Sequence, residues 1–517
     1  MGFSDTLTDV SGFAAVLPEI LLVIWGAAVL AADLFASATI KRKTLGWLAA
    51  GGMLFILVLT WFMRPVEGPN NVLGSMVRND TWTWAFRIIF ILGGALTCIA
   101  SIDFKPAHAA GEYFSLIIFA SLGMSLMAAS NDIVMLYLAM ETASIALYLL
   151  AGFMRNNKLS AEAGIKYFVF GAVASTVMLF GLSLLYGMSG GNTGYAQLAQ
   201  RLAAPELRTG ALFATLLVIV GFAFKTSAVP FHFWAPDVYQ GAPTPVAGFI
   251  STASKAAGFA ILVRFLFGVL LSGEVSAAAA AMVSLLRPFA VLTLIVGSLG
   301  ALVQTNVKRM LAYSSIAQAG YMLMGVAAFA GASSAAGREE ALAAVLFYIG
   351  TYMITNIGAF SVVGAVSQRL GGDDYANFAG LARRAPYLAL AMTAALLSLL
   401  GAPPMVGFAG KLFVFRSVMG AYTASGDPFF LWLIVVGVVM VLVSVFYYLA
   451  VVKSMYVDRA IDDTKPMLVH GATGVVAVVC GLGVIATTLL AGPLFDIAAS
   501  AARSFMLADT IAQVALK

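Results

Sequence analysis

The sequence predicts an all-α polytopic membrane protein with about fourteen transmembrane helices. Of its 517 residues, 61% are hydrophobic and only 10% are charged, whereas soluble proteins carry about 25% charged residues. The mean hydropathy is +0.96. A helix crosses the hydrocarbon core with roughly 20 apolar residues. The stretches that meet this length lie near 13–35, 44–63, 82–103, 113–129, 131–153, 162–187, 211–237, 243–270, 281–304, 309–331, 340–366, 386–421, 428–452 and 471–493.

Two of these spans are interrupted by proline, and each carries a lysine. The seventh contains Lys225, Pro230 and Pro236, and the twelfth contains Pro403-Pro404 and Lys411. Proline breaks a helix and frees backbone carbonyls, and freed backbone at membrane depth is tolerated only where it lines protein or a wet cavity. A break beside a charge therefore predicts an ion or proton path.

The two broken spans lie five spans apart, which favours a duplicated five-helix unit. We divide the chain into an N-terminal three-helix segment (1–112), a first repeat (113–270), a second repeat (281–455) and a C-terminal helix and tail (471–517). Because five is odd, the copies have inverted topology, and such repeats place an ion site near mid-membrane. Two independent proline kinks are the alternative, since the halves are weakly similar in sequence.

The distribution of basic residues predicts the orientation in the membrane. The net charge is +5, and the basic residues are scattered in short loops, so no nucleic-acid partner is expected. One side holds Lys41, Arg42, Lys43, Lys105, Arg155, Lys158, Lys308, Arg309, Arg369, Arg383, Arg384, Lys453, Arg459 and Lys465, and the other holds Arg64, Arg78, Arg201, Arg208, Arg287, Arg338, Arg503 and Lys517. The loop at 38–43 is therefore predicted to be cytoplasmic and both termini periplasmic.

Four charged residues lie near the centre of a span: Glu141, Lys225, Lys255 and Lys411. A central side chain is roughly 15 Å from either membrane surface, given a rise of about 1.5 Å per residue. Burial disfavours a charged lysine and a nearby carboxylate favours it, so a pair that forms and breaks can hold and release a proton. Glu141 and Lys225 are the predicted switch pair, with Lys255 and Lys411 as later stations. Static ion pairs are the alternative, although one carboxylate cannot neutralise three lysines.

Other charged residues have simpler interpretations. Lys166, nearer a span end, either tunes the switch pair or extends to the surface. His232 titrates near neutral pH, but it is also consistent with a hydrogen-bonded buried histidine. Asp33, Arg87, Arg264 and Arg416 are expected to reach a span edge, and Glu19 is expected to be structural. The hairpin at 297–325, with its basic turn, is assigned no chemistry.

The sequence contains no pattern for a bound cofactor or metal. Cys98 and Cys480 both lie in apolar spans, so neither a disulfide framework nor a metal cluster is expected. A Walker A loop, a dinucleotide fingerprint and a pair of haem-ligating histidines are not found. Energy for pumping is therefore expected from an ion gradient or another subunit.

Two runs carry a specific resemblance to a known family. The run Lys-Thr-Ser-Ala-Val-Pro-Phe-His-Phe-Trp-Ala-Pro-Asp-Val-Tyr-Gln-Gly-Ala-Pro-Thr-Pro-Val at 225–246 and the run Lys-Arg-Met-Leu-Ala-Tyr-Ser-Ser-Ile at 308–316 resemble the antiporter-like membrane subunits of respiratory complex I, the NADH:quinone oxidoreductase. The resemblance extends over essentially the whole chain. It is strongest to the N-type subunits, because the lateral helix of the L-type is missing and Lys411 stands where the M-type has glutamate.

This resemblance implies a fold, a function and partners. It implies fourteen helices in inverted five-helix repeats with helices seven and twelve broken. Glu141, Lys225, Lys255 and Lys411 match the proton-channel residues of the family, and Lys166 matches its span-six lysine. Quinone reduction in other subunits, which hold FMN and iron–sulfur clusters and use NADH, would drive pumping. The implied neighbours are the M-type subunit, the small K-type subunit and the lipid of a bacterial inner membrane.

Two other functions stay open at this point. A subunit of a multisubunit cation/proton antiporter or of a membrane hydrogenase would share the fold. A scaffold bundle that bridges pump subunits would need no buried relay, and neutralising Glu141 or Lys255 would then have no effect.

Overall fold

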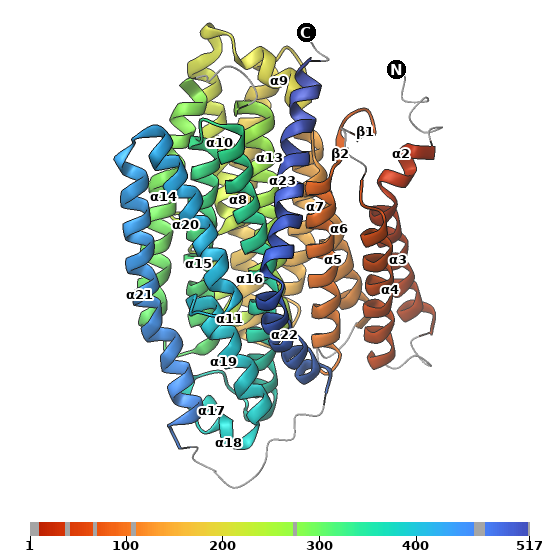
Figure 1. Ribbon diagram of the computed structural model, residues 1–517. Coiled ribbons are helices and arrows are strands. Elements are labelled where there is room, and N and C mark those ends of the chain that lie inside the picture. The colour runs from red at the N-terminus through yellow and green to blue at the C-terminus, as the bar shows by residue number, and fades with distance from the viewer. Residues whose placement is uncertain are drawn as a thin grey trace.

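The structure, a computed structural model, describes residues 10–36, 42–65, 70–104, 110–271, 277–459 and 471–514. Long helices run side by side along one common direction (Figure 1). Twelve helical segments of the described chain are long and apolar enough to cross a membrane. The other two predicted spans, 309–331 and 386–421, are helical but contain more polar residues or a break. Lys41, Lys105, Lys465 and Lys517, which were used to predict the orientation, lie outside the described residues.

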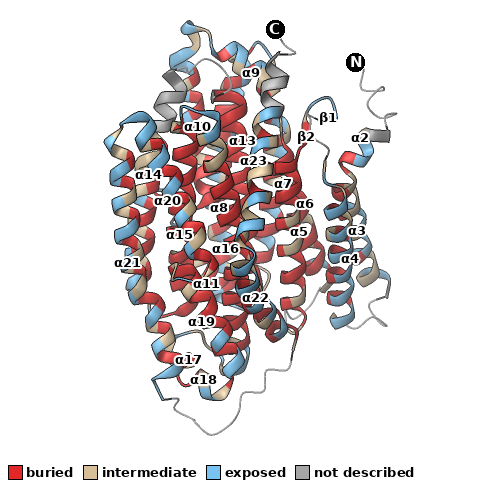
Figure 2. Cartoon of the chain, viewed as in Figure 1, coloured by how far each residue is buried: buried red, intermediate tan, exposed pale blue. Residues whose placement is uncertain are grey.

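The N-terminal segment is a group of helices joined by a short hairpin. Its elements are α2 (Val10–Ala15), α3 (Leu17–Ala36), α4 (Arg42–Phe62), β1 (Asn70–Val72), β2 (Val77–Asn79) and α5 (Thr81–Ser101). The two strands pair antiparallel. Asp80 caps α5 by accepting a hydrogen bond from the backbone N–H of Thr83 over 2.8 Å. Helix α5 is buried along most of its length, whereas α3 and α4 expose much of their surface (Figure 2).

The next segment contains the first broken span. Its elements are α6 (Ala110–Ala129), α7 (Ile133–Ala151), α8 (Lys158–Met188), α9 (Tyr195–Leu202), the 3₁₀ helix η1 (Pro205–Leu207), α10 (Arg208–Thr226), α11 (Trp234–Gly241), α12 (Thr244–Phe249), the π-helix η2 (Ile250–Ser254), α13 (Lys255–Phe265) and the π-helix η3 (Leu266–Leu271). Span 211–237 is therefore two helices, α10 and α11, with non-helical chain between them. Span 243–270 is continuous but widened by two π-helical turns.

The second broken span lies in the following segment. Its elements are α14 (Ala277–Leu302), α15 (Val307–Gly331), α16 (Ala335–Leu370), α17 (Tyr375–Phe378), α18 (Leu381–Arg384), α19 (Pro386–Leu400), α20 (Val406–Ser425) and α21 (Pro428–Tyr456). Span 386–421 is divided between α19 and α20 at Gly401, which adopts a left-handed φ of 82°. Glycine tolerates this conformation because it has no Cβ.

The C-terminal segment differs from its prediction. A helix followed by a tail is expected after residue 471, but a second helix, α23 (Ala491–Val514), follows α22 (Ala472–Leu489). Helix α23 packs against α5 and α16. Its mixture of alanine with charged residues kept it from being predicted as a span. It closes one side of the bundle, where Phe505 is fully buried against Trp82.

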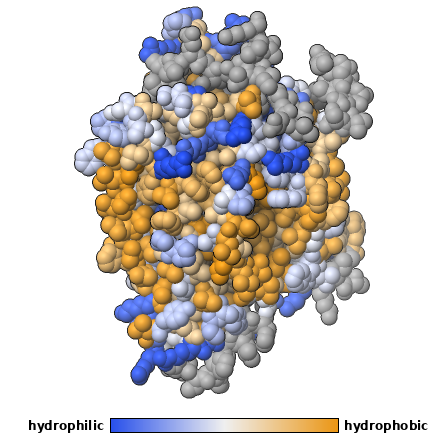
Figure 3. All heavy atoms as spheres, viewed as in Figure 1, coloured by the Kyte–Doolittle hydropathy of each residue, from blue (hydrophilic) through white to orange (hydrophobic). Residues whose placement is uncertain are grey.

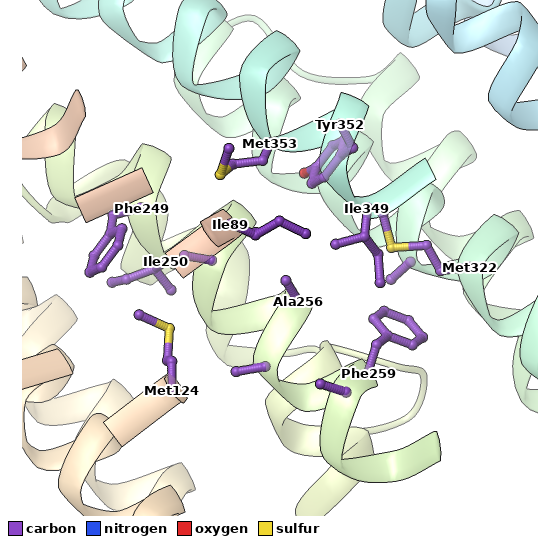
Figure 4. Close-up of a cluster of buried hydrophobic side chains, with 14 of the residues drawn as sticks. Ile89, Met124, Phe249, Ile250, Ala256, Phe259, Met322, Ile349, Tyr352 and Met353 are labelled. Carbon is purple, nitrogen blue, oxygen red and sulfur yellow. The ribbon is translucent and has the colours of Figure 1, made fainter. Parts of the chain in front are cut away.

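The core is continuous from the N-terminal helices to the C-terminal ones. Figure 4 shows Ile89 of α5, Ala256 of α13 and Met353 of α16 in one apolar cluster. Small residues let helix backbones approach closely. A Cβ on Gly123 of α6 would lie only 2.5 Å from a backbone atom of α7. Such contacts fix the register between neighbouring helices.

The prediction that Arg87 and Arg264 reach a span edge is wrong. Arg264 is 1% exposed, and its guanidinium donates to both carboxylate oxygens of Asp80 at 3.0 and 2.9 Å. Arg87 is also buried and donates to Glu19 over 2.7 Å. A buried carboxylate satisfies a guanidinium better than extension toward water, and the sequence does not reveal that these helices meet. Glu19 has the structural role that was expected.

Candidate functional site

Lys225 lies in the last turn of α10, where the broken span begins. The helix ends because Ser227 adopts a left-handed φ of 58°, and the chain then continues through Pro230. Lys225 is 2% exposed. A cation is favoured at a helix C-terminus by the partial negative charge of the carbonyls there. The break thus creates a position where a buried lysine is stabilised without a direct ion pair.

The Lys225 ammonium donates a hydrogen bond to the hydroxyl of Ser144 on α7 over 3.0 Å. Glu141 lies one turn earlier on α7, within electrostatic range of Lys225, and its Oε1 atom is buried without a hydrogen-bond partner. The predicted switch pair is therefore adjacent, but among the described residues it forms no salt bridge. Ser144, not Glu141, accepts the hydrogen bond from Lys225.

Lys255 begins α13 directly after the π-helical turn η2 and is 1% exposed. Its Nζ donates to the backbone oxygen of Ser315 on α15 over 2.6 Å and also to the Ser315 hydroxyl. No described carboxylate forms a salt bridge with it. π-Helical turns occur frequently at functional sites, and here the turn precedes a buried cation that is held only by neutral oxygen atoms.

Lys411 lies on α20, just after the second break. Because α19 ends at Gly401, the carbonyl groups of Leu399 and Leu400 are not used within the helix, and each accepts a hydrogen bond from Lys411 Nζ at 2.9 Å. The ammonium also lies 4.5 Å from the centre of the Tyr321 ring, a favourable cation–π contact. The predicted link between a helix break and a buried lysine is thus present in both broken spans.

Polar side chains on α15 and its neighbours connect the region of Lys255 with that of Lys411. Gln318 donates from Nε2 to the Leu399 carbonyl over 2.9 Å, the same oxygen that Lys411 contacts. Gln318 also donates to the Tyr448 hydroxyl over 3.1 Å and accepts from the Tyr348 hydroxyl. The Ser314 hydroxyl bonds to Tyr448. Ser314 adjoins Ser315, the partner of Lys255. We call Ser314, Ser315, Gln318, Tyr348 and Tyr448 the α15 polar chain.

The sequence analysis missed the α15 polar chain. The hairpin at 297–325 is assigned no chemistry there, although Ser314, Ser315 and Gln318 lie inside an apolar span. These polar residues could have revealed the chain, because buried hydroxyl and amide groups in a membrane need hydrogen-bond partners. The two tyrosines lie more than 30 residues away from Ser315, so only the packing of α16 and α21 against α15 reveals them.

Further polar groups lie near Lys255 on η2 and α16. Asn356 of α16 donates to the Ser251 hydroxyl over 2.8 Å and to the Tyr352 hydroxyl over 3.0 Å. Tyr352 in turn donates to the Ser251 carbonyl over 3.2 Å. These contacts fix the polar face of α16 against η2, and they hold the turn that presents Lys255.

Buried hydroxyl groups near Lys225 and Lys255 form no hydrogen bond of normal geometry. They belong to Ser227, Tyr239 and Ser254, although Tyr239 lies close to the hydroxyls of Ser227 and Ser315. Gly258, one turn beyond Lys255, packs against the side chain of Lys225, since a Cβ there would lie 3.2 Å from Lys225 Cγ. The two lysines therefore belong to helices in direct contact, and polar atoms able to hold water lie around them.

Lys166 lies apart from the buried lysines. Its side chain is 36% exposed and forms salt bridges with Glu162 at 2.6 Å and Asp237 at 2.5 Å. Asp237 is shared with Arg309 at 2.6 Å. This arrangement matches extension toward the surface. Asp237 lies in the first turn of α11, just after the break, so Lys166 also links α8 to the second half of the broken span.

His232 lies in the non-helical chain between α10 and α11. It is buried, its ring lies 4.5 Å from that of Phe233, and its Nδ1 atom has no hydrogen-bond partner among the described residues. A hydrogen bond with the Pro230 backbone agrees with the alternative of a hydrogen-bonded buried histidine, so only the Nδ1 side of the ring is left over for other chemistry. In the described part of the chain, no group of three or more His, Cys, Asp or Glu side chains is placed to hold a metal ion.

Comparison with known proteins identifies the family. A family model described as "NADH:quinone oxidoreductase/Mrp antiporter, TM" matches residues 130–442. NADH-quinone oxidoreductase subunit N of Moorella thermoacetica is 40% identical over 491 residues, covering 95% of this chain and 98% of that protein. The subunit N of Heliobacterium modesticaldum is 39% identical over 495 residues, covering 95% and 99%.

Solved structures share the fold. A chain of respiratory complex I from Thermus thermophilus superposes with a TM-score of 0.75 at 29% identity, covering 93% of this chain and 99% of that one. A chain of the Mrp complex from Dietzia sp. superposes with a TM-score of 0.80 at 19% identity, covering 96% and 99%, which shows a common fold. The chain therefore belongs to the NADH:quinone oxidoreductase and Mrp antiporter membrane-subunit family, within its subunit N group.

Proposed function

We propose that this chain is a proton-translocating membrane subunit of an NADH:quinone oxidoreductase, and that protons move through Glu141, Lys225, Lys255 and Lys411. The observation that carries the proposal is the α15 polar chain. Its hydrogen bonds run from Ser314 through Tyr448 and Gln318 to the Leu399 carbonyl that holds Lys411. Ser314 is next in sequence to Ser315, the partner of Lys255. A row of hydroxyl and amide groups between two buried cations suits proton transfer, whereas a purely structural core would bury apolar residues there.

The first step in this account is a competition for Lys225. In the conformation described, Lys225 donates to neutral Ser144. Movement toward Glu141 would form an ion pair and stabilise the charged lysine, and movement back would release its proton. At an effective dielectric of about 20, a charge pair at about 4 Å is worth roughly 4 kcal/mol. This energy is large enough to decide whether the lysine holds a proton.

The second step passes the proton from Lys225 to Lys255. Ser227, Tyr239 and Ser254 have buried hydroxyl groups that form no hydrogen bond of normal geometry, and ordered water normally satisfies such groups. Water bridging these hydroxyls would complete a hydrogen-bonded path between the two lysines. His232, whose Nδ1 atom has no hydrogen-bond partner among the described residues, would be a side entry, and Lys166 would tune the path through Asp237.

We also infer that 113–270 and 281–455 are inverted repeats. Asp132 forms an isolated β-bridge with Gly194, and Asn306 forms one with Asp374. Each bridge joins the start of the second helix of a repeat, α7 or α15, to the chain that follows the third helix, α8 or α16. Both bridging residues at the helix starts are N-caps with a side-chain acceptor. Helices α9 and α17, which begin directly after the two bridges, lie at opposite ends of the bundle (Figure 1).

Helix contacts support the same equivalence. A Cβ on Gly123 of α6 would lie 2.5 Å from the backbone nitrogen of Ala143 of α7. A Cβ on Gly297 of α14 would lie 2.4 Å from the backbone nitrogen of Ala317 of α15. Each glycine precedes its alanine by the same number of residues. When Ala143 of α7 is aligned with Ala317 of α15, Ser315 is equivalent to Glu141 and Gln318 is equivalent to Ser144. The residues next to Lys225 on α7 thus correspond to residues of the α15 polar chain.

The remaining parts of the proposal concern the assembly. The M-type and K-type membrane subunits are proposed neighbours, and FMN, iron–sulfur clusters, NADH and quinone are assigned to other subunits. The chain is a multi-span membrane protein of a respiratory-complex family. We propose a bacterial inner-membrane location with both termini periplasmic.

The experiment that tests the function is purification through a tag on this chain in mild detergent. The purified assembly is assayed for inhibitor-sensitive NADH:quinone reductase activity. Co-purification of that activity is the expected result. An intact assembly without flavin and iron–sulfur subunits would contradict the proposal and favour a cation/proton antiporter.

A further inference from the structure

An apolar groove opens between the N-terminal helices α4 and α5 and the helices α16, α22 and α23. Its volume is about 220 Å³. The residues that line it include Trp61, Trp84, Leu92, Gly350, Ile354 and Leu494. The groove does not touch any of the four relay residues. The proposed proton path therefore gives no account of this groove.

The groove runs from the membrane interface into the hydrocarbon region. Trp61 lies at the end of α4 and Trp84 in the first turn of α5. Tryptophan is enriched at the headgroup level of membranes. Leu92 lies two turns further along α5, about 12 Å deeper at a rise of about 1.5 Å per residue. This extent suits a chain that lies parallel to the helices.

Arg64 lies at the mouth of the groove. Its guanidinium carbon lies 5.4 Å from the centre of the Trp84 ring, and its Nη2 donates to the Ser500 hydroxyl over 2.7 Å. The Trp84 ring is itself held by a hydrogen bond from its Nε1 to the Thr60 carbonyl over 2.8 Å. Among the described residues, Arg64 forms no salt bridge with a carboxylate. The Arg64 guanidinium is thus held above an apolar groove, and it has N–H donors left to bind an external anion.

We propose that this groove binds one acyl chain of an anionic phospholipid whose phosphate is held by Arg64. Arginine matches phosphate geometry with paired N–H donors, and the apolar walls match a hydrocarbon chain. Hydrophobic residues form the middle of this face of the molecule, with hydrophilic residues above them (Figure 3). A lipid whose headgroup lies at the level of Arg64 would place its phosphate near the hydrophilic residues and its acyl chain against the hydrophobic ones.

The bound chain would support the helix that carries part of the polar path. Gly350 and Ile354 of α16 line the groove, while Tyr348 and Tyr352 of the same helix face the polar groups. Figure 4 shows Tyr352 and Met353 next to each other, with Ile89 of α5 near them, and Met353 and Ile89 both line the groove. Filling the groove with lipid would therefore hold α16 in position without a direct contact to a lysine.

The experiment uses the complete tagged assembly and counts retained phospholipids by native mass spectrometry. Gly350→Leu fills the groove without a backbone clash, because the only contact of a Cβ there is Ile89 Cδ1 at 3.9 Å. We expect this variant to lose one tightly retained phospholipid. Gly420→Leu is the matched control, since Gly420 lies in α20 with open space around it, and it should retain the wild-type number.

The second variant tests the headgroup. Arg64→Gln should lower retention of phosphatidylglycerol relative to phosphatidylethanolamine about tenfold, consistent with loss of a charged hydrogen bond, whereas Arg208→Gln, an exposed arginine on the same predicted side, should not. Equal lipid counts in Gly350→Leu and Gly420→Leu would overturn the proposal. An unchanged lipid preference in Arg64→Gln, or retention of a neutral isoprenoid quinone in place of phospholipid, would overturn it as well.

Discussion

Lys225 donates its hydrogen bond to Ser144, not to Glu141, so the direct partner of this buried lysine is a neutral hydroxyl. Ser144 and Glu141 lie one turn apart on α7, so a small movement of the lysine side chain changes its partner. In the proposed relay, Ser144 stabilises the separated state, and the ion pair with Glu141 is the alternative state. The balance between them sets how readily a proton leaves.

Ser144→Ala should shift that balance toward the ion pair. The variant removes one hydrogen bond, worth about 1 kcal/mol, which corresponds to roughly a fivefold change in the equilibrium. We expect proton pumping in the purified assembly to fall by about that factor while the complex still assembles. Ser183→Ala, an exposed serine of α8 whose hydroxyl bonds only within its helix, is the control. Unchanged pumping in Ser144→Ala would remove this serine from the account.

Gln318→Leu should interrupt the α15 polar chain with little change in side-chain volume. The variant removes the contacts to the Leu399 carbonyl and to the hydroxyls of Tyr348 and Tyr448. We expect proton pumping and NADH:quinone turnover to fall together at least tenfold. The measurement is acidification of proteoliposomes that contain the assembled complex. Gln304→Leu also loses a hydrogen bond, but away from the chain, and should pump normally. Normal pumping in Gln318→Leu would show that protons do not use this route.

Comparing Gly401→Ala with Gly426→Ala tests whether pumping falls because Lys411 is displaced or because the backbone is strained. Gly401 has a left-handed φ of 82°, and a Cβ there would lie 3.0 Å from Lys411 Cδ. Gly426 has a φ of 67° and open space. Alanine should cost about 1–2 kcal/mol of stability at both positions. Only Gly401→Ala should reduce pumping, because only there does the new methyl group displace Lys411. Equal pumping in the two variants, compared at matched thermal stability, would contradict this role of Gly401.

Arg264 and Asp80 should behave as a structural pair. Arg264→Met leaves a buried carboxylate short of a partner, which typically costs about 3–5 kcal/mol. We expect a clear drop in the thermal unfolding temperature of the assembly. The double variant Arg264→Met with Asp80→Asn should cost less than the two single changes added together. Arg416→Met, at an exposed pair with Glu340, should cost at most about 1 kcal/mol. Additive effects of the two buried changes would exclude coupling.

The sequence alone predicts much of the fold, because its signals are local. Long apolar stretches predict helices, and Pro230 and Pro403 predict the two breaks. The four mid-span charges are visible because a charge at that depth is rare. Fourteen helices and two repeats stay predictions, although the paired β-bridges and glycine contacts support the repeats.

What the sequence cannot predict is which distant side chains meet. The Arg264–Asp80 pair joins residues far apart in the chain, and extension of Arg264 to the membrane surface was the wrong expectation. The α15 polar chain depends on Tyr348 and Tyr448, which come from two other helices. Ser144 was also missed, because one serine beside a glutamate carries no distinctive pattern. Each of these contacts is set by helix packing, which hydropathy does not encode.

The central claim is that Lys255 passes protons between the two halves of the chain, and one measurement tests it most directly. Lys255→Met keeps most of the side-chain length but removes the charge and the donors to Ser315. The complex is reconstituted in proteoliposomes, and protons pumped per NADH oxidised are measured together with turnover. Lys158→Met, at an exposed lysine, serves as the control. We predict at least a tenfold loss of pumping in a fully assembled Lys255→Met complex. Pumping at the wild-type ratio and rate in that complex would contradict the account.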